Sequence, residues 1–147
     1  MTGQQKERQR CLIAEDNIVC RSILSGFLNK HYECDFAVNG QEAFELYKLS
    51  HNKKKPYQLV CLDVVMPVVD GLEALHKIRC FEKDIAVPPN MEVKAIMISA
   101  LSSPSTVFKA MYRSGAHGYV IKPVKATDLN TQLVQAGLPS VSPIGGL

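Results

Sequence analysis

The feature of this sequence that most constrains its fold is an alternation between short apolar runs and longer stretches of helical periodicity. Each run has the length of a buried strand, and each is followed by apolar residues that recur every three or four positions. The strand-like runs are 11–14, 32–38, 57–62, 93–98 and 118–121. This repeat is typical of a parallel sheet covered by helices on both faces. We therefore predict a doubly wound α/β domain with five parallel strands.

Turn and capping residues divide the predicted elements. Asn17 is a suitable N-cap for the first helix, and the dipeptides Asn39-Gly40 and Asp70-Gly71 interrupt the chain before two others. We expect a loop over 50–56 and a last helix over 126–135. The first helix is predicted to bury one apolar stripe, which contains Val19, Ile23, Leu24, Phe27 and Leu28.

Length and hydropathy predict one domain and no membrane association. A chain of 147 residues is long enough for one hydrophobic core and too short for two ordinary ones. We place the domain at 10–137, with a flexible leader at 1–9 and a flexible tail, rich in Pro, Ser and Gly, at 138–147. No apolar run approaches the roughly 20 residues that span a bilayer. We therefore expect a cytoplasmic protein.

Charge and cysteine usage argue against several other classes of function. The net charge is only +3, and the basic cluster Lys53–Lys55 beside a proline has the character of a solvated loop, so we expect no nucleic-acid binding. The five cysteines include no Cys-x-x-Cys pair, so neither a disulfide framework nor a zinc site is expected. Cys11 and Cys61 lie in apolar runs, where free cysteine behaves as a small hydrophobe. The four histidines lack metal-ligand spacing, and we expect them at the surface or at helix ends.

Polar side chains follow the strand-like runs at the positions where a ligand site is expected. In a doubly wound sheet, ligands bind beyond the carboxyl ends of the strands. The residues at these ends are Glu15 and Asp16, Asp63, Ser99 and Ala100, and Lys122. Three carboxylates, a hydroxyl and an amine should therefore meet at one edge of the sheet, although they are far apart in sequence.

The three carboxylates predict a magnesium site. Neighbouring carboxylates repel one another and tolerate their charges only beside a cation. Mg²⁺ suits oxygen ligands in a site that also holds a phosphoryl group and several waters. We expect Asp16 to bind the ion directly, Glu15 through water, and the backbone carbonyl of Val65 to complete the protein ligands. Asp63 would place one oxygen on the metal and use the other as a nucleophile.

The remaining groups at this edge suit phosphoryl transfer, which depends on positioning and charge neutralisation more than on acid–base chemistry. The Lys122 ammonium would balance the charge of the phosphoryl oxygens. The Ser99 hydroxyl and the Ala100 amide would donate hydrogen bonds to the same oxygens.

These motifs resemble the receiver domains of two-component response regulators, especially the stand-alone CheY-like members. The resemblance covers roughly 10–136. It rests on four motifs, which are Leu12-Ile13-Ala14-Glu15-Asp16-Asn17, Asp63 with Met66-Pro67 and Asp70-Gly71, Ser99-Ala100, and Gly118-Tyr119-Val120-Ile121-Lys122-Pro123. It implies a flavodoxin-like, CheY-like three-layer sandwich with strand order 2-1-3-4-5. It also implies that Asp63 is the phospho-acceptor, Ser99 the switch hydroxyl and Tyr119 the switch aromatic residue.

By the same resemblance, the chain is a signalling domain that catalyses only its own phosphotransfer and dephosphorylation. A sensor histidine kinase or a histidine phosphotransfer protein would donate the phosphoryl group. The switch would then remodel the face at 104–135, which a downstream protein would read and through which two copies can pair. Too few residues follow Gln135 for a DNA-binding or enzyme domain, so we expect no output module in this chain. The alternatives are a protein that signals by binding, a phosphorelay intermediate, or a fragment of a larger hybrid kinase or regulator.

Three other interpretations fit the sequence less well. A haloacid-dehalogenase phosphatase usually needs a second aspartate two residues after its nucleophile, where this chain has Val65. A flavin-binding flavodoxin would cradle phosphate after the first strand, where Glu15 and Asp16 would repel it. A receiver that is never phosphorylated would lack the acidic pair, the acceptor or the lysine, and all are present.

Overall fold

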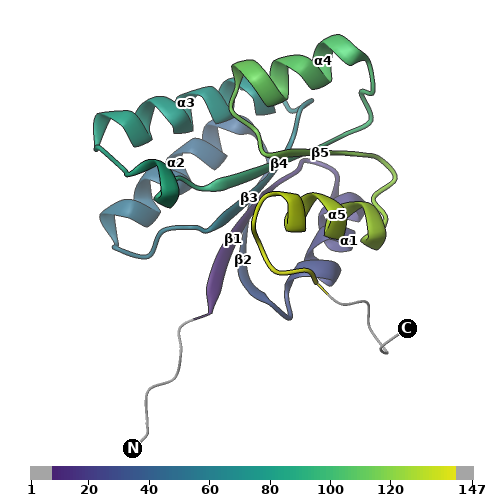
Figure 1. The fold of residues 1–147 in the computed structure, drawn as a ribbon, viewed down its shortest axis with the longest axis horizontal. Coiled ribbons are helices and arrows are strands. Elements are labelled where there is room, and N and C mark those ends of the chain that lie inside the picture. Colours follow the sequence, from purple (N-terminus) through teal and green to yellow (C-terminus); the bar gives the residue numbers. More distant parts are fainter. Residues whose placement is uncertain (1–7, 142–147) are drawn as a thin grey trace, which may run out of the picture.

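The computed structural model describes residues 8–141 and confirms the predicted doubly wound sheet (Figure 1). All strand pairs are parallel, and the order is β2-β1-β3-β4-β5. The strands are β1 (Gln9–Ala14), β2 (Tyr32–Ala37), β3 (Leu59–Asp63), β4 (Lys94–Ser99) and β5 (Gly118–Ile121). The helices are α1 (Ile18–Leu28), α2 (Gly40–Asn52), α3 (Gly71–Asp84), α4 (Pro104–Phe108) and α5 (Ala126–Gln135), with a 3₁₀ turn η1 (Pro89–Met91) and a π-helical segment η2 (Lys109–Arg113).

The helices form two layers, with α1 and α5 on one face of the sheet and α2, α3 and α4 on the other (Figure 1). Successive strand residues therefore enter different cores. Cys11 and Ile13 of β1 pack with α1 and α5, whereas Leu12 and Ala14 pack with α2 and α3. Both faces are covered, which is why the central strands β1, β3 and β4 appear in the sequence as nearly continuous apolar runs, whereas the edge strand β2 contains Glu33 and Asp35. Cys11 and Cys61 are free and buried in the core, as predicted.

The apolar stripe predicted for α1 is only partly buried. Leu24 and Leu28 are enclosed, but Val19 is 64% exposed and Ile23 is also exposed. Val19 and Ile23 precede Leu24 by five residues and one residue, which places them about 140° and 100° around the helix from Leu24. They therefore lie off the buried face.

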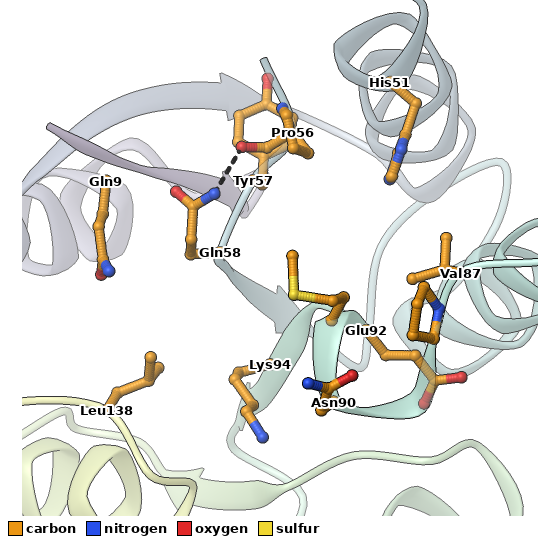
Figure 2. A pocket seen from close by; sticks show the side chains of 12 residues that line it. Gln9, His51, Pro56, Tyr57, Gln58, Val87, Asn90, Glu92, Lys94 and Leu138 are labelled. Carbon is orange, nitrogen blue, oxygen red and sulfur yellow. Dashed lines mark hydrogen bonds between the residues drawn. The ribbon is translucent and has the colours of Figure 1, made fainter. Parts of the chain in front are cut away.

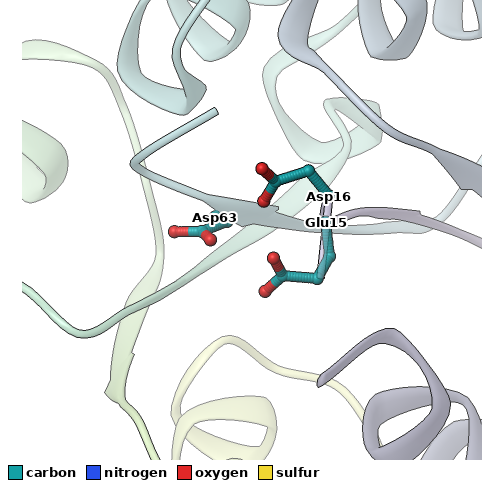
Figure 3. A group of neighbouring side chains, drawn as sticks. All are labelled: Glu15, Asp16 and Asp63. Carbon is teal, nitrogen blue, oxygen red and sulfur yellow. The ribbon is translucent and has the colours of Figure 1, made fainter. Parts of the chain in front are cut away.

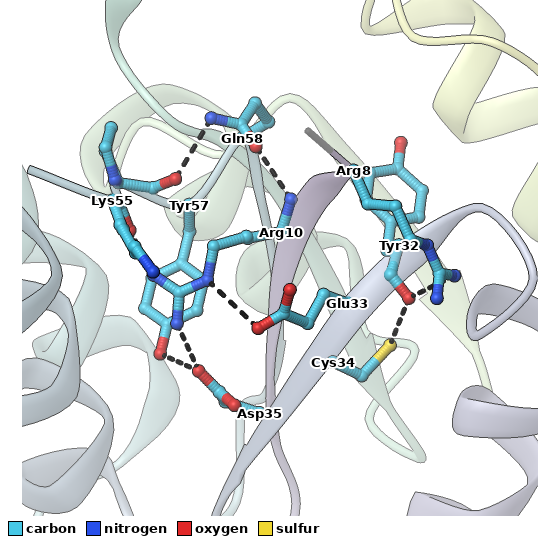
Figure 4. A network of polar contacts seen from close by, with 10 residues as sticks. Arg8, Arg10, Tyr32, Glu33, Cys34, Asp35, Lys55, Tyr57 and Gln58 are labelled. Carbon is cyan, nitrogen blue, oxygen red and sulfur yellow. Dashed lines mark hydrogen bonds and ion pairs between the residues drawn. The ribbon is translucent and has the colours of Figure 1, made fainter. Parts of the chain in front are cut away.

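The connection after α2 also differs from the prediction. The helix continues to Asn52, inside the predicted loop, and β3 begins at Leu59 and not at 57. Tyr57 is nevertheless buried, because its hydroxyl donates a 2.7 Å hydrogen bond to Asp35 and the Arg10 guanidinium lies 4.5 Å from its ring centroid (Figure 4). Burial and the bond to Asp35 raise the pKa of the Tyr57 hydroxyl. The cluster joins the amino ends of β1, β2 and β3.

The ordered domain extends beyond both predicted boundaries. Arg8, which was assigned to the flexible leader, donates a 3.0 Å hydrogen bond to the Tyr32 carbonyl, and β1 begins at Gln9. At the other end, Val141 is buried and its N–H donates to the Asn130 side chain at 2.6 Å. The first part of the predicted tail therefore packs on the domain. The rest of the predicted leader (1–7) and tail (142–147) lies outside the described residues.

A buried carboxylate holds the long connection between α3 and β4. Glu82 is fully buried and accepts hydrogen bonds from the Tyr47 hydroxyl at 2.7 Å and the Val93 amide at 2.8 Å. Its charge pairs with Arg79 at 2.6 Å, and Arg79 also donates to the Gly115 carbonyl at 2.9 Å. Glu82 thus connects α2, α3 and β4, and through Arg79 it reaches the turn that follows η2.

The same connection forms one wall of a hollow of about 490 Å³ at the amino ends of the strands (Figure 2). Val87, Pro88 and Met91 line one side, and Tyr57 and Leu138 contribute further apolar surface. The hollow therefore lies at the opposite edge of the sheet from the acidic residues. Among the helices of residues 8–141, none is both long enough and apolar enough to cross a membrane.

We expect His117 to make stability depend on pH. Its Nδ1 accepts a 3.1 Å hydrogen bond from the Ala95 amide, so the ring is neutral in the folded state. Burial lowers the pKa of His117 to about 4, and the charges of Arg79 and Lys94 act in the same direction, against that of Glu82. Because the unfolded chain takes up this proton near its ordinary pKa of about 6.5, stability is complete above that pH and falls as the pH decreases towards 4.

The expected loss between pH 7 and pH 4.5 is about 2 kcal/mol from this residue. Urea unfolding of the wild type and of His117→Asn at both pH values measures it, because the carboxylates contribute equally to the two proteins. The wild type should lose more stability than the variant by this amount. An equal loss in the two proteins would contradict the assignment.

Candidate functional site

The carboxyl ends of β1, β3 and β5 bring the predicted acidic and basic residues together. Glu15 follows β1, Asp63 is the last residue of β3, and Lys122 follows β5. Glu15, Asp16 and Asp63 each direct a carboxylate oxygen into the same space, and these oxygens lie within 4.8 Å of one another (Figure 3). Glu15 and Asp63 are buried and Asp16 is exposed. The side chains thus form an anionic crevice that is open to solvent on the Asp16 side.

Lys122 lies between the two buried carboxylates. Its ammonium is 2.7 Å from Glu15 Oε1 and 2.9 Å from Asp63 Oδ2. Burial alone would lower the pKa of Lys122, but its bonds to Glu15 and Asp63 raise that pKa above its ordinary value. Lys122 is therefore a permanent cation in this site.

The two carboxylates respond differently to this environment. Burial favours a higher pKa for Glu15, but the bonds from Lys122 and the Asn17 amide bring that pKa below its ordinary value. The pKa of Asp63 is raised, because burial and the neighbouring Glu15 outweigh the bonds from Lys122 and the Val65 amide. Repulsion between acidic neighbours is thus concentrated on Asp63, and an added cation would relieve it.

The donor set fits a hard divalent cation. The three carboxylates carry three negative charges against the single positive charge of Lys122, and all ligand atoms that they offer are oxygens. Glu15, Asp16 and Asp63 are the residues that could hold Mg²⁺. The Val65 amide donates to Asp63 Oδ1 at 3.0 Å, which fixes this loop beside the crevice. The role of the Val65 carbonyl as a ligand stays a prediction.

Close backbone contact explains the glycine that precedes α3. A Cβ added to Gly71 would lie 2.0 Å from the Asp63 carbonyl oxygen, and the Gly71 amide donates to the Val64 carbonyl at 2.9 Å. Asp70 caps the helix by accepting from the Glu73 amide at 2.8 Å. The dipeptide Asp70-Gly71 therefore allows α3 to start directly against the end of β3.

We predict that Gly71→Ala destabilises the protein by about 2 kcal/mol or more, because the new methyl group must displace backbone atoms at Asp63. Thermal unfolding measures this effect. Gly26→Ala is a matched control, since nothing lies within 4 Å of the added Cβ there. Equal stability of the two variants would exclude a role for this close approach.

Ser99 and Tyr119 are connected through Leu101. Ser99 is buried, and its Oγ accepts a 3.1 Å hydrogen bond from the Leu101 amide. The Tyr119 hydroxyl donates to the Leu101 carbonyl at 2.6 Å. A movement of the β4–α4 loop at Leu101 therefore reaches both side chains. Sequence reasoning selected Ser99 and Tyr119 but not the link between them, which the Leu101 backbone makes and which has no side-chain signal.

Cys20 is a second contact that sequence reasoning missed. Burial and the neighbouring Glu15 carboxylate raise the pKa of the Cys20 thiol to about 12. Cys20 lies in the first turn of α1, where its amide also donates to the Asn17 cap. Ala100, the last of the predicted residues, is exposed directly after β4, beside the crevice.

A doubly wound sheet with an acidic cluster at the carboxyl ends of its strands places the protein in the flavodoxin-like class of α/β domains. Comparison with known proteins agrees with this fold. The sequence model described as "Response regulator receiver domain" matches residues 11–134. The chain belongs to this family, and it is a receiver domain of two-component signalling.

Similar sequences include complete small regulators and parts of large kinases. The chemotaxis protein CheY of Halobacterium salinarum is 32% identical over 78% of this chain and 85% of its own length. A probable transcriptional regulator, ycf29 of Porphyra purpurea, is 30% identical over 80% of this chain. The chain spans 51% of that regulator and 8% of the hybrid signal transduction histidine kinase I of Dictyostelium discoideum.

Solved structures show the same fold. A receiver in the CheX–CheY–BeF₃–Mg²⁺ complex of Borrelia burgdorferi superimposes with a TM-score of 0.72 and 25% identity, over 88% of this chain and 90% of its own. The co-crystal structure of the Saccharomyces cerevisiae phosphotransfer protein Ypd1 with the receiver domain of Ssk1 matches with a TM-score of 0.70 and 31% identity, over 88% and 92% of the two chains.

Proposed function

We propose that this receiver accepts a phosphoryl group on Asp63 from a phosphohistidine, in a step that requires Mg²⁺. The observation that carries the proposal is the environment of the Asp63 carboxylate. One oxygen is held by Lys122 at 2.9 Å, and the group shares its crevice with Glu15 and Asp16. A carboxylate in this position has both a cation to receive transferred charge and partners for a metal ion.

Each residue has a defined part in the transfer. An Asp63 oxygen forms a bond to phosphorus as the phosphorus–nitrogen bond of the phosphohistidine breaks, and the imidazole leaves with the electron pair and takes up a proton. Lys122, Ser99 and the Ala100 amide bind the phosphoryl oxygens. Glu15 and Asp16, with the Val65 carbonyl, hold Mg²⁺, which neutralises the charge that develops on the oxygens. Hydrolysis of the acyl phosphate resets the domain.

Phosphorylation is proposed to act on the output face through Leu101. A phosphoryl group that draws Ser99 Oγ towards it competes with the 3.1 Å bond from the Leu101 amide. The Leu101 carbonyl holds the Tyr119 hydroxyl, so the loop and the tyrosine change position together. The face of α4, β5 and α5 would then present a different surface to a downstream protein or to a second copy.

The proposed donor is a sensor histidine kinase or a histidine phosphotransfer protein, and the proposed location is the cytoplasm. Ssk1, whose receiver is 31% identical, crystallises with the phosphotransfer protein Ypd1. Exposed apolar side chains at the start of α1, Ile18 and Val19, lie shortly after the acidic pair and offer a surface for such a donor. The receiver domain can act as a phospho-acceptor either as a separate protein or as part of a larger one.

Incubation with acetyl phosphate tests the proposal, because this small donor needs no partner protein. In Mg²⁺ the protein should gain one phosphoryl group by intact mass, and hydroxylamine should remove it, as expected of an acyl phosphate. Chelation of Mg²⁺ with EDTA should prevent the gain. A stable, hydroxylamine-resistant label, or labelling that proceeds equally in EDTA, would contradict the proposal.

A further inference from the structure

Val68, in the loop between β3 and α3, has a backbone conformation that its side chain does not favour. Its φ is +69°, in the left-handed region, and the Val69 amide donates a 2.8 Å hydrogen bond to the Pro67 carbonyl across it. A bond between residues two apart with positive φ at the centre is the pattern of a γ-turn of the rare, strained kind. For a β-branched residue, this conformation is a true outlier.

The two other non-glycine residues with positive φ have an ordinary explanation that Val68 lacks. Lys54 and Ala86 follow the carboxyl ends of α2 and α3, where a left-handed residue commonly closes a helix. Val68 follows no helix. Its turn is imposed by its neighbours, because the Val69 carbonyl accepts a 2.9 Å hydrogen bond from the Gly40 amide. That hydrogen bond accounts for the turn, but glycine or asparagine at position 68 would adopt the same turn without strain.

The side chain gains no compensating contact within the molecule. Val68 is 81% exposed, the highest value among the large apolar residues that lie exposed on the described chain. A residue that is both strained and exposed contributes nothing to the stability of the free domain, and strain of this kind persists at sites of function. Whatever it contacts is therefore outside this molecule.

The position of Val68 limits what that contact can be. Asp63, five residues earlier, is only 4% exposed, so a protein that brings a phosphohistidine to it must press on the rim of the crevice. Val65 and Val68 belong to the β3–α3 loop, which begins directly after Asp63, and both are exposed and apolar. A small phosphodonor such as acetyl phosphate has no protein surface that must contact this loop.

We propose that Val68 is a specificity-determining contact for a histidine phosphotransfer protein of the kind represented by Ypd1. The apolar side chain is retained in a strained turn because it packs against the surface of the phosphotransfer protein beside the phosphohistidine. This inference rests on the proposed function of Asp63. It adds that protein donors and small donors are distinguished at this loop.

Three substitutions distinguish the effect of the apolar side chain from the effect of the backbone strain. Val68→Gly removes both the side chain and the strain. Val68→Asn relieves the strain and places a polar side chain of similar size, and Val68→Ile keeps both an apolar side chain and the strain. Phosphorylated Ypd1 of Saccharomyces cerevisiae serves as the protein donor, and acetyl phosphate serves as the small donor. Radiolabel on the receiver is followed with time for each donor, and thermal unfolding is measured for each variant.

We expect Val68→Gly and Val68→Asn to melt about 2–4 °C higher than the wild type. Their labelling by phospho-Ypd1 should be roughly tenfold slower, with labelling by acetyl phosphate unchanged. Val68→Ile should resemble the wild type in all three measurements. Transfer from phospho-Ypd1 at the wild-type rate in the glycine and asparagine variants would overturn the proposal.

The two donors distinguish a failure of this inference from a failure of the proposed function. Wild-type protein that is labelled by acetyl phosphate but not by phospho-Ypd1 would contradict the choice of partner and leave the function of Asp63 intact. Wild-type protein that is labelled by neither donor would contradict both.

Discussion

Replacing Asp63 by asparagine is expected to abolish phosphoryl labelling by acetyl phosphate. Asparagine has nearly the same shape, so the end of β3 and its contact with the Val65 amide can persist. The amide lacks the negative charge that makes the carboxylate a nucleophile and a metal ligand, and its nitrogen cannot form a stable acyl phosphate. The loss should therefore be complete within detection, as measured by intact mass after incubation in Mg²⁺.

Asp70→Asn provides the matched control for this experiment. Asp70 lies in the same loop but is exposed, and it acts as the N-cap of α3 by accepting from the Glu73 amide. Asparagine is an equally good N-cap, so this variant should fold and label like the wild type. Label on Asp63→Asn at the wild-type rate would show that another residue accepts the phosphoryl group.

The largest expected effect on stability comes from Glu82→Ala. The substitution leaves the Arg79 guanidinium half-buried without its 2.6 Å partner and removes the acceptor of the Tyr47 hydroxyl and the Val93 amide. Breaking a buried ion pair by removing one partner typically costs about 3–5 kcal/mol, mostly because the remaining charge is uncompensated. We expect a loss in this range in urea unfolding.

Two further variants identify the origin of that loss. Glu82→Gln keeps an acceptor for Tyr47 and Val93 but loses the charge, and it should be less destabilising than Glu82→Ala. Glu73→Ala, at an exposed position of the same helix, should cost less than about 1 kcal/mol. A cost for Glu82→Ala as small as that for Glu73→Ala would mean that the buried network does not hold the α3–β4 connection.

Those parts of the fold that depend on periodicity could be predicted from the sequence. The five predicted runs became the five strands, and the signal is strongest in β1, β3 and β4, where burial on both faces leaves a nearly continuous apolar run. The meeting of Glu15, Asp63 and Lys122 followed from the same pattern, since parallel strands end at one edge of the sheet. The roles of these residues in catalysis remain predictions.

Features that depend on packing between distant segments could not be predicted. Glu82 lies at helical spacing from the buried residues Leu75 and Ile78. A carboxylate is rarely buried without an ion-pair partner, and nothing in the sequence marks Arg79 as the partner of Glu82. The π-helical η2 continues directly from the end of α4, and there the Ser114 amide donates a hydrogen bond to the Lys109 carbonyl. Such local choices are decided by tertiary contacts.

Magnesium binding by the folded, unphosphorylated protein tests the central claim most directly. Calorimetric titration of the wild type with MgCl₂ should show one ion bound per chain, and Asp16→Asn should weaken this binding strongly, because Asp16 is the exposed member of the acidic cluster. Circular dichroism would establish that both proteins are folded. Wild-type protein that is folded and takes up no Mg²⁺ would contradict the account, because the three carboxylates would then not form the metal site on which phosphorylation of Asp63 depends.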